Sequence, residues 1–308
     1  MNRCPISYEP CGSEKYSSSG LKRLSPMLDS LHNFPYDKGE QLREAIARAS
    51  KMSIQGVQPK LSVKLNRQKK TFEVQDAGGE FILKPQNDAY PELPENEDLT
   101  MRLASAIGIE IPLHGMIYCK DGTRSYIIKR FDRLPRKKKV AVEDFAQLSG
   151  QTRETKYRSS MEKVAGVIEQ YCTFPLIEKQ KLFRLTIFSF LCGNEDMHLK
   201  NFSLIQRNEK VELSPAYDLV NTTIALPNAI EELALTIDGK KNKITKEILI
   251  DYFAFQRLKL TKLTIDKTLD GIKRELPTWQ GLIKISFLSS EMKNKYEDLL
   301  QQRWSRIF

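Results

Sequence analysis

The residues best suited to chemistry lie in one segment, which reads Gly-Asn-Glu-Asp-Met-His-Leu-Lys-Asn-Phe-Ser at 193–203. It places Asp196 five residues before Asn201, and a second acid, Asp218, follows after two short strand-like runs. In such an order one carboxylate accepts the proton of a substrate hydroxyl, while the Asn and the second Asp hold magnesium on nucleotide phosphates. The spacing therefore predicts phosphoryl transfer, with Asp196 as general base and with Asn201 and Asp218 as Mg²⁺ ligands.

Two further side chains lie inside this segment. Lys200 is placed to steady the transferred phosphate, as lysine does near the catalytic acid of kinases, and is the second candidate catalytic residue. For His198 we favour a structural role, packed beneath the loop, over a part in the chemistry.

A lysine closes the short apolar strand that the sequence Phe-Ile-Leu-Lys predicts at 81–84. From a strand end, Lys84 could reach the α- and β-phosphates of ATP, and it would need an acidic partner on the following helix. We expect Glu97 to be that partner, with Glu95 as the alternative. A strand-end lysine alone would usually be a surface residue, but here the other parts of a kinase site follow it in order.

The loop Ser-Ile-Gln-Gly-Val-Gln-Pro-Lys at 53–60 lies where a kinase has its phosphate-covering loop. It is not a Walker A loop, since the pattern GxxxxGK[ST] occurs nowhere in the chain. Ser53 would stand beside the γ-phosphate, and Gln58 and Lys60 could approach phosphate oxygens.

Hydrophobic periodicity predicts the elements that position these residues. Residues 1–35 lack a period and are expected to form an extended arm. Helices are predicted at 39–50 and 95–107, and strands at 61–65, 81–84, 116–119 and 125–130. The remainder is mainly helical, with predicted helices at 143–149, 160–171, 177–192, 245–257, 262–274 and 287–304. The apolar helix 177–192 should be the buried spine of this part.

These elements predict an α+β fold of the bilobal protein-kinase type, with a small β-rich N-lobe and a mainly helical C-lobe. We expect an N-terminal arm and helix at 1–50, the N-lobe at 51–135, and the C-lobe with the catalytic loop at 136–308.

Charge, cysteine content and hydropathy indicate which partners and which cellular compartment to expect. With 49 Lys and Arg against 39 Asp and Glu, the net charge is +10, which favours a polyanionic partner without selecting one. The five cysteines form no CxxC pair, and no signal peptide or membrane-length apolar run is evident. We expect a cytoplasmic protein without a membrane partner. Direct nucleic-acid binding is the weaker alternative, because the basic run Lys137–Lys139 has no neighbouring aromatics suited to stacking.

Taken together, these motifs resemble the HipA family of bacterial toxin kinases. The resemblance runs in order from about residue 50 to the C-terminus. It is carried by 53–60, Phe-Ile-Leu-Lys-Pro at 81–85, Asn96-Glu97, Lys-Arg-Phe-Asp-Arg at 129–133, Glu143-Asp144, 193–203 and Tyr217-Asp218.

The resemblance implies a serine/threonine protein kinase of a toxin–antitoxin system that uses ATP and Mg²⁺. By position, Lys84 would bind ATP, residues 129–131 including Phe131 would lie at the adenine hinge, and Ser53 would be autophosphorylated. Lys129 stands where full-length members usually carry Glu, so a side-chain contact at that position is not carried over.

The resemblance also implies partners. Family toxins phosphorylate aminoacyl-tRNA synthetases and so stall translation, and a helix-turn-helix antitoxin of the HipB type holds them in check and links them to DNA. The short segment before residue 53 resembles the HipT type, in which a separate small HipS-like antitoxin supplies a missing subdomain. The alternatives are a pseudokinase or scaffold that binds the antitoxin–DNA complex without turnover, and a small-molecule kinase.

Overall fold

The computed structural model describes residues 2–48, 58–134, 139–152, 154–226 and 230–308. The chain divides into two compact units. The first comprises Met1–Asp98, Pro112–Lys138 and Ile285–Phe287, and the second comprises Leu99–Ile111, Lys139–Lys284 and Leu288–Phe308. The domain boundaries expected near residues 50 and 135 stay predictions.

An antiparallel sheet forms the centre of the first unit. Its strands are β3 (Leu61–Asn66), β4 (Thr71–Val74), β5 (Phe81–Lys84), β6 (His114–Tyr118) and β7 (Arg124–Lys129), in the order β4-β3-β5-β7-β6. All of them were predicted except β4, which has only four residues and follows a polar run at 67–70. The register sets Lys84 of β5 opposite Tyr126 of β7.

The N-terminal segment differs from the extended arm that we expected. It contains β1 (Asn2–Arg3), β2 (Pro10–Gly12) and α1 (Ser18–Leu24), and Ser17 caps α1 by accepting from the Gly20 amide at 3.0 Å. Cys4, Ile6 and Phe34 are fully buried and join the core beneath the sheet. The prediction was wrong because these apolar residues are irregularly spaced, so their burial leaves no period in the sequence.

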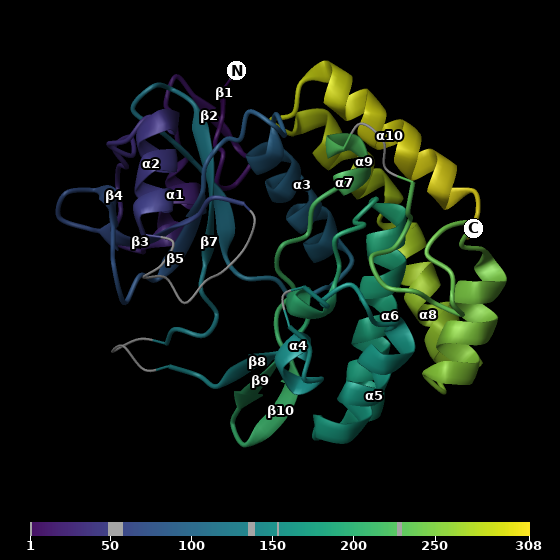
Figure 1. Cartoon of the computed structure of the whole chain (residues 1–308). Coiled ribbons are helices and arrows are strands. Elements are labelled where there is room, and N and C mark those ends of the chain that lie inside the picture. The colour runs from purple at the N-terminus through teal and green to yellow at the C-terminus, as the bar shows by residue number, and fades with distance from the viewer. Residues whose placement is uncertain (1, 49–57, 135–138, 153, 227–229) are drawn as a thin grey trace. The chain divides into compact units, whose positions relative to one another are not determined.

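Helix α2 (Lys38–Arg48) lies close to its predicted place and packs against β3 (Figure 1). Its buried positions are Gln41 and Ala45, whereas the apolar residues Leu42 and Ile46 are 43% and 68% exposed. Gln41 can be buried because its amide donates to Tyr36 O at 3.2 Å and accepts from the Ser125 hydroxyl at 2.8 Å.

The second unit is mainly helical, with one small antiparallel sheet. Its strands β8 (Val142–Asp144), β9 (Ser203–Arg207) and β10 (Lys210–Leu213) are ordered β10-β9-β8. The helices are α4 (Phe145–Leu148), α5 (Met161–Tyr171), α6 (Pro175–Leu191), the 3-10 helix η2 (Leu199–Asn201), α7 (Thr222–Ala225), the π-helix η3 (Ile248–Arg257), α8 (Lys262–Arg274), α9 (Leu276–Ile285) and α10 (Ser290–Trp304).

Helix α6 forms the core of this unit, as its apolar sequence predicts. Its residues from Leu185 to Leu191 are all buried, α5 runs beside it (Figure 1), and α10 packs on it as well. The helix predicted at 287–304 begins only at Ser290, and α9 before it was missed. Pro277 obscured α9 in the sequence, but at the second helical position a proline sacrifices no internal hydrogen bond.

Helix α3 (Leu93–Ala106) carries charge into a buried environment. Glu95, Glu97 and Asp98 in its first two turns are at most 2% exposed, and they are buried in addition to Leu99 and Leu103 on the apolar face that predicted this helix. Among the described residues, no helix is both long and apolar enough to cross a membrane.

Candidate active site

In the first unit, the structure brings together the lysine and the acid that the sequence pairs. Lys84 ends β5, Glu97 lies on α3, and Nζ is 2.6 Å from Oε1. Their side chains are 5% and 0% exposed, and Nζ also lies 5.7 Å from the ring centroid of Tyr126. A charged pair this deep loses its hydration, so each partner needs the other to remain ionised.

The alternative acid, Glu95, has other partners. Its carboxylate accepts from Arg124 Nη2 at 3.1 Å and from Gln86 Nε2 at 2.8 Å. Burial raises the pKa of Glu95, while Gln86 and Arg124 oppose that shift. Asp98 pairs with His114 at 3.0 Å, so the acids of this turn are distributed among different strands.

The other residues proposed for the nucleotide have less defined surroundings. The side-chain nitrogen of Gln58 is buried, and within the described residues no hydrogen-bond acceptor reaches it. Phe131 follows β7 and is half-buried. Ser53 lies outside the described residues.

In the second unit, the catalytic loop starts where α6 ends. Cys192 caps α6 and is fully buried, and Gly193 takes a left-handed φ of 67°. A Cβ at Gly193 would lie 2.5 Å from Leu299 Cδ2 and 2.7 Å from Asn221 Oδ1, so only glycine fits. The Thr222 hydroxyl donates to Gly193 O at 3.1 Å and accepts from the Glu195 amide at 2.7 Å.

Asp196 and Asn201 are fixed to each other through the backbone. Asn201 donates from Nδ2 to Asp196 O at 2.7 Å, and the Asp196 amide donates to Asn194 Oδ1 at 3.2 Å. Because Nδ2 is engaged, Oδ1 is the Asn201 atom left to bind a metal ion. The Asp196 side chain is 46% exposed, so its carboxylate is accessible to a substrate.

Asp218 is held beside the same loop. Its own φ is 54°, a value that L-residues rarely adopt, and its neighbour Tyr217 donates to Lys200 O at 2.9 Å. Burial lowers the pKa of His198, and the carboxylates of Asp196 and Asp218 oppose that shift from nearby. The imidazole is 4% exposed, as expected for a packed residue.

Lys200 forms an ion pair that the sequence did not predict. Its Nζ lies 3.1 Å from Asp144 Oδ2. Asp144 also caps α4, because its Oδ1 accepts from the Gln147 amide at 2.9 Å. In return, the side-chain oxygen of Gln147 accepts from the Asp144 amide at 3.0 Å. In the sequence, Glu143-Asp144 belongs only to the family resemblance, because the contact of Asp144 with the loop depends on tertiary packing.

Two further residues, Lys156 and Tyr157, contact the catalytic loop, and the sequence did not predict either contact. The Leu199 amide donates to Lys156 O at 3.3 Å, Lys156 Nζ lies 2.6 Å from His198 Nε2, and the Tyr157 hydroxyl donates to Asp196 Oδ1. Nothing in the sequence near them has a recognisable catalytic spacing.

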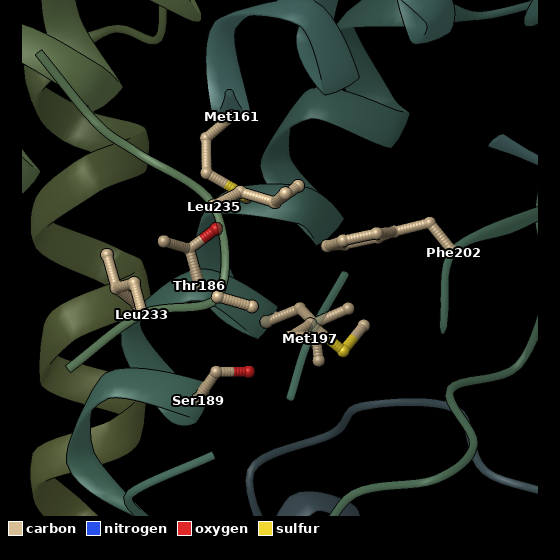
Figure 2. A pocket seen from close by; sticks show the side chains of 9 residues that line it. Met161, Thr186, Ser189, Met197, Phe202, Leu233 and Leu235 are labelled. Carbon is tan, nitrogen blue, oxygen red and sulfur yellow. The ribbon is translucent and has the colours of Figure 1, made fainter. Parts of the chain in front are cut away.

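The inner side of the loop is apolar. Met197 and Phe202 are 5% and 3% exposed and line a small pocket together with residues of α5, α6 and the segment 233–235. Figure 2 shows Met197 and Phe202 among the side chains that line this pocket, with Met161, Leu233 and Leu235. The loop is therefore anchored by apolar packing below, while Asp196 remains accessible.

A buried ion pair joins the loop to the last helix. Arg303 of α10 reaches Glu195 Oε1 at 3.2 Å and Phe190 O at 2.7 Å, and it is 4% exposed. Thr223 also contacts Glu195 Oε1 at 2.6 Å. Burial raises the pKa of Glu195, and Thr223 and Arg303 oppose the shift.

Several curated proteins resemble this chain. A putative kinase of Haemophilus influenzae is 31% identical over 242 residues, covering 72% of this chain and 69% of the relative. A putative kinase of Sinorhizobium fredii is 31% identical over 265 residues, covering 80% and 64%. The serine/threonine-protein kinase toxin HipA of Shewanella oneidensis is 28% identical over 209 residues, covering 62% and 47%. The chain thus spans between about half and two thirds of their lengths.

Solved structures confirm a mixed helix-and-sheet fold of the HipA and kinase type. A chain in the complex of HipA, HipB and operator DNA from Shewanella oneidensis has a TM-score of 0.70 at 23% identity, covering 91% of this chain and 72% of that one. The Helicobacter pylori kinase CtkA has a TM-score of 0.51 at 16% identity, covering 74% and 85%. The sequence model of the HipA-like C-terminal domain matches residues 52–279, and the chain belongs to this family.

Proposed function

We propose that this chain is an ATP-dependent serine/threonine protein kinase that acts as the toxin of a toxin–antitoxin system. The catalytic loop supports this most directly, because Asp196 is accessible and Asn201 is oriented by its bond to Asp196 O at 2.7 Å. Relationship to a named serine/threonine kinase toxin and to putative kinases supports it.

In this proposal Asp196 accepts the proton of the substrate hydroxyl. Asn201 and Asp218 would hold Mg²⁺, and the donor set fits that ion because an amide oxygen and a carboxylate are hard ligands. When bound, Mg²⁺ supplies neutralisation of charge on the phosphate oxygens. Lys200 would steady the transferred group, with Asp144 fixing the position of its ammonium.

On the nucleotide side, Lys84 would bind ATP phosphates while Glu97 keeps it charged and oriented. Gln58 fits an anionic ligand, because its buried amide nitrogen finds no acceptor in the described part of the chain. Phe131 would lie at the adenine hinge. Ser53 would be the autophosphorylated residue, where a phosphate adds about two negative charges.

The same proposal includes the bilobal kinase organisation, with the first unit as small lobe and the second as helical lobe. The client is a protein, most simply an aminoacyl-tRNA synthetase whose phosphorylation stalls translation. The partners are a HipB-like antitoxin, through which alone the chain meets DNA, and a HipS-like antitoxin of the HipT type. A solved complex of a related HipA with HipB and operator DNA supports the HipB-like part.

A cytoplasmic location also belongs to the proposal. All five cysteines are free thiols. Reduced thiols are expected where glutathione and thioredoxin prevent disulfide formation.

The test is intact-mass spectrometry of the wild type, Asp196→Asn and a control, Asp266→Asn, before and after incubation with Mg-ATP. Asp266 lies exposed on α8 in the same unit. We expect added phosphate on the wild type and the control only, with peptide mapping placing it at Ser53. Normal phosphorylation of Asp196→Asn would reject the general base. An unphosphorylated wild type, unmodified before incubation as well, would favour the pseudokinase.

A further inference from the structure

The carboxylate of Asp196 is not held by the catalytic loop alone. Its Oδ1 accepts from the Tyr157 hydroxyl, and Tyr157 comes from the segment between α4 and α5. Within the described residues, no hydrogen-bond donor contacts Oδ2 of Asp196. The two carboxylate oxygens therefore differ, one being engaged by a phenol and the other remaining available.

Tyr157 is itself held against the loop. Its ring stands edge-on to His198, with centroids 4.9 Å apart and an interplanar angle of 82°. Lys156 Nζ lies 4.9 Å from the Tyr157 ring centroid and 2.6 Å from His198 Nε2. The backbone bond from Leu199 to Lys156 O, at 3.3 Å, attaches the segment to η2. Side-chain and backbone contacts thus both hold residues 156 and 157 against the catalytic loop.

This arrangement meets a requirement of the proposed reaction. A general base works only if one lone pair is directed at the proton that it removes, and a partly exposed aspartate can rotate about its side-chain bonds. A donor that binds one carboxylate oxygen removes much of that freedom. The phenol remains a donor at neutral pH, because burial and then the Asp196 charge raise the pKa of Tyr157.

We propose that Tyr157 is a positioning residue of the phosphoryl-transfer site, whose hydroxyl holds Oδ1 of Asp196 so that Oδ2 receives the proton of the substrate hydroxyl. The inference rests on the proposed kinase function. Lys156 and His198 act through Tyr157, by fixing the place and tilt of its ring. The proton passes from the substrate oxygen to Oδ2 as that oxygen bonds to the γ-phosphorus of ATP, and the bond from this phosphorus to the bridging oxygen breaks so that ADP leaves.

The test separates the hydroxyl from the ring. Tyr157→Phe removes only the oxygen, Tyr157→Leu removes the ring as well, and Tyr171→Phe makes the same change at a 40% exposed tyrosine of α5. The full chain is used, with Mg-ATP and its own Ser53 or a serine peptide as acceptor. Transfer rate, KM for ATP, the ATP dissociation constant and Tm are measured for each variant.

We expect Tyr157→Phe to lower kcat roughly tenfold, the size of effect typical of a lost hydrogen bond to a charged group, with KM for ATP, ATP affinity and Tm unchanged. Tyr171→Phe should behave as the wild type, and Tyr157→Leu should also lower Tm. A Tyr157→Phe variant with wild-type kcat would leave only a packing role and overturn the inference, and a faster variant would instead identify the phenol as a blocking group. A wild type that transfers no phosphate would overturn the proposed function as well.

Discussion

The two lysines of the candidate site, one in each unit, are held in different ways. In the first, Lys84 pairs with Glu97, and the pair is buried between a strand and a helix, with side chains 5% and 0% exposed. In the second, Lys200 and Asp144 are 32% and 17% exposed, and the loop around them is fixed by contacts from several segments. A single deep pair is rigid but vulnerable to one substitution, whereas a distributed set of contacts should lose stability in small steps.

The largest effect should come from breaking the buried pair. Lys84→Met removes the ammonium that faces the buried Glu97 carboxylate, and we expect a loss of about 3–5 kcal/mol in the free energy of unfolding. Urea denaturation measures it, with Lys64→Met on the exposed side of β3 as control.

The double variant Lys84→Met/Glu97→Met tests whether the carboxylate that the single variant leaves buried causes this loss of stability. Replacing both members of a buried pair by apolar side chains is often nearly neutral, so stability should recover by at least half while ATP binding stays lost. If the double variant is no more stable than Lys84→Met, the buried Glu97 carboxylate is not the cause of the stability loss in Lys84→Met.

An intermediate effect is expected where the loop begins. Gly193→Ala must adopt a φ of 67° and place its Cβ within 2.7 Å of Asn221 Oδ1, so we expect a loss of about 2–4 kcal/mol. Gly166→Ala in α5 is the matched change with open space at the Cβ, and it should stabilise by about 0.5–1 kcal/mol. Equal Tm shifts for the two variants would contradict the crowding at Gly193.

The smallest loss of stability is expected for the exposed pair. Lys200→Met and Asp144→Asn should each cost less than about 1 kcal/mol, since solvent screens a half-exposed ion pair and Asn still caps α4. If Lys200 steadies the transferred phosphate, kcat should nevertheless fall roughly 100-fold in Lys200→Met. An unchanged kcat would remove Lys200 from the proposed chemistry and leave it a surface residue.

The same contrast explains how far the sequence predicts the site. Asp196 and Asn201 interact five residues apart, and Lys84 and Glu97 lie on consecutive elements with recognisable apolar patterns, so the sequence grouped the first two and limited the partner of Lys84 to Glu97 or Glu95. Tyr157 contacts Asp196 over 39 residues of sequence, Asp144 contacts Lys200 over 56, and Arg303 contacts Glu195 over 108. Such contacts form only after the helices pack and leave no local pattern.

The fold shows a similar division. Regular periodicity predicted α5, α6 and α8 within a few residues, because one face of each must be buried. It did not predict the burial of Cys4, Ile6 and Phe34, which lie in short or irregular segments. Nor did it predict the exposure of Leu42 and Ile46, since hydrogen bonds allow Gln41 to occupy the core instead.

Cys192 at the end of α6 allows local opening at the start of the catalytic loop to be measured chemically. Its thiol is fully buried, and burial raises its pKa to about 12, so the native protein presents almost no reactive thiolate at this position. Alkylation of Cys192 therefore requires that the loop's attachment open first. The ratio of its alkylation rate to that of a free cysteine gives the fraction of time spent open, and so the local free energy of opening directly beside Gly193.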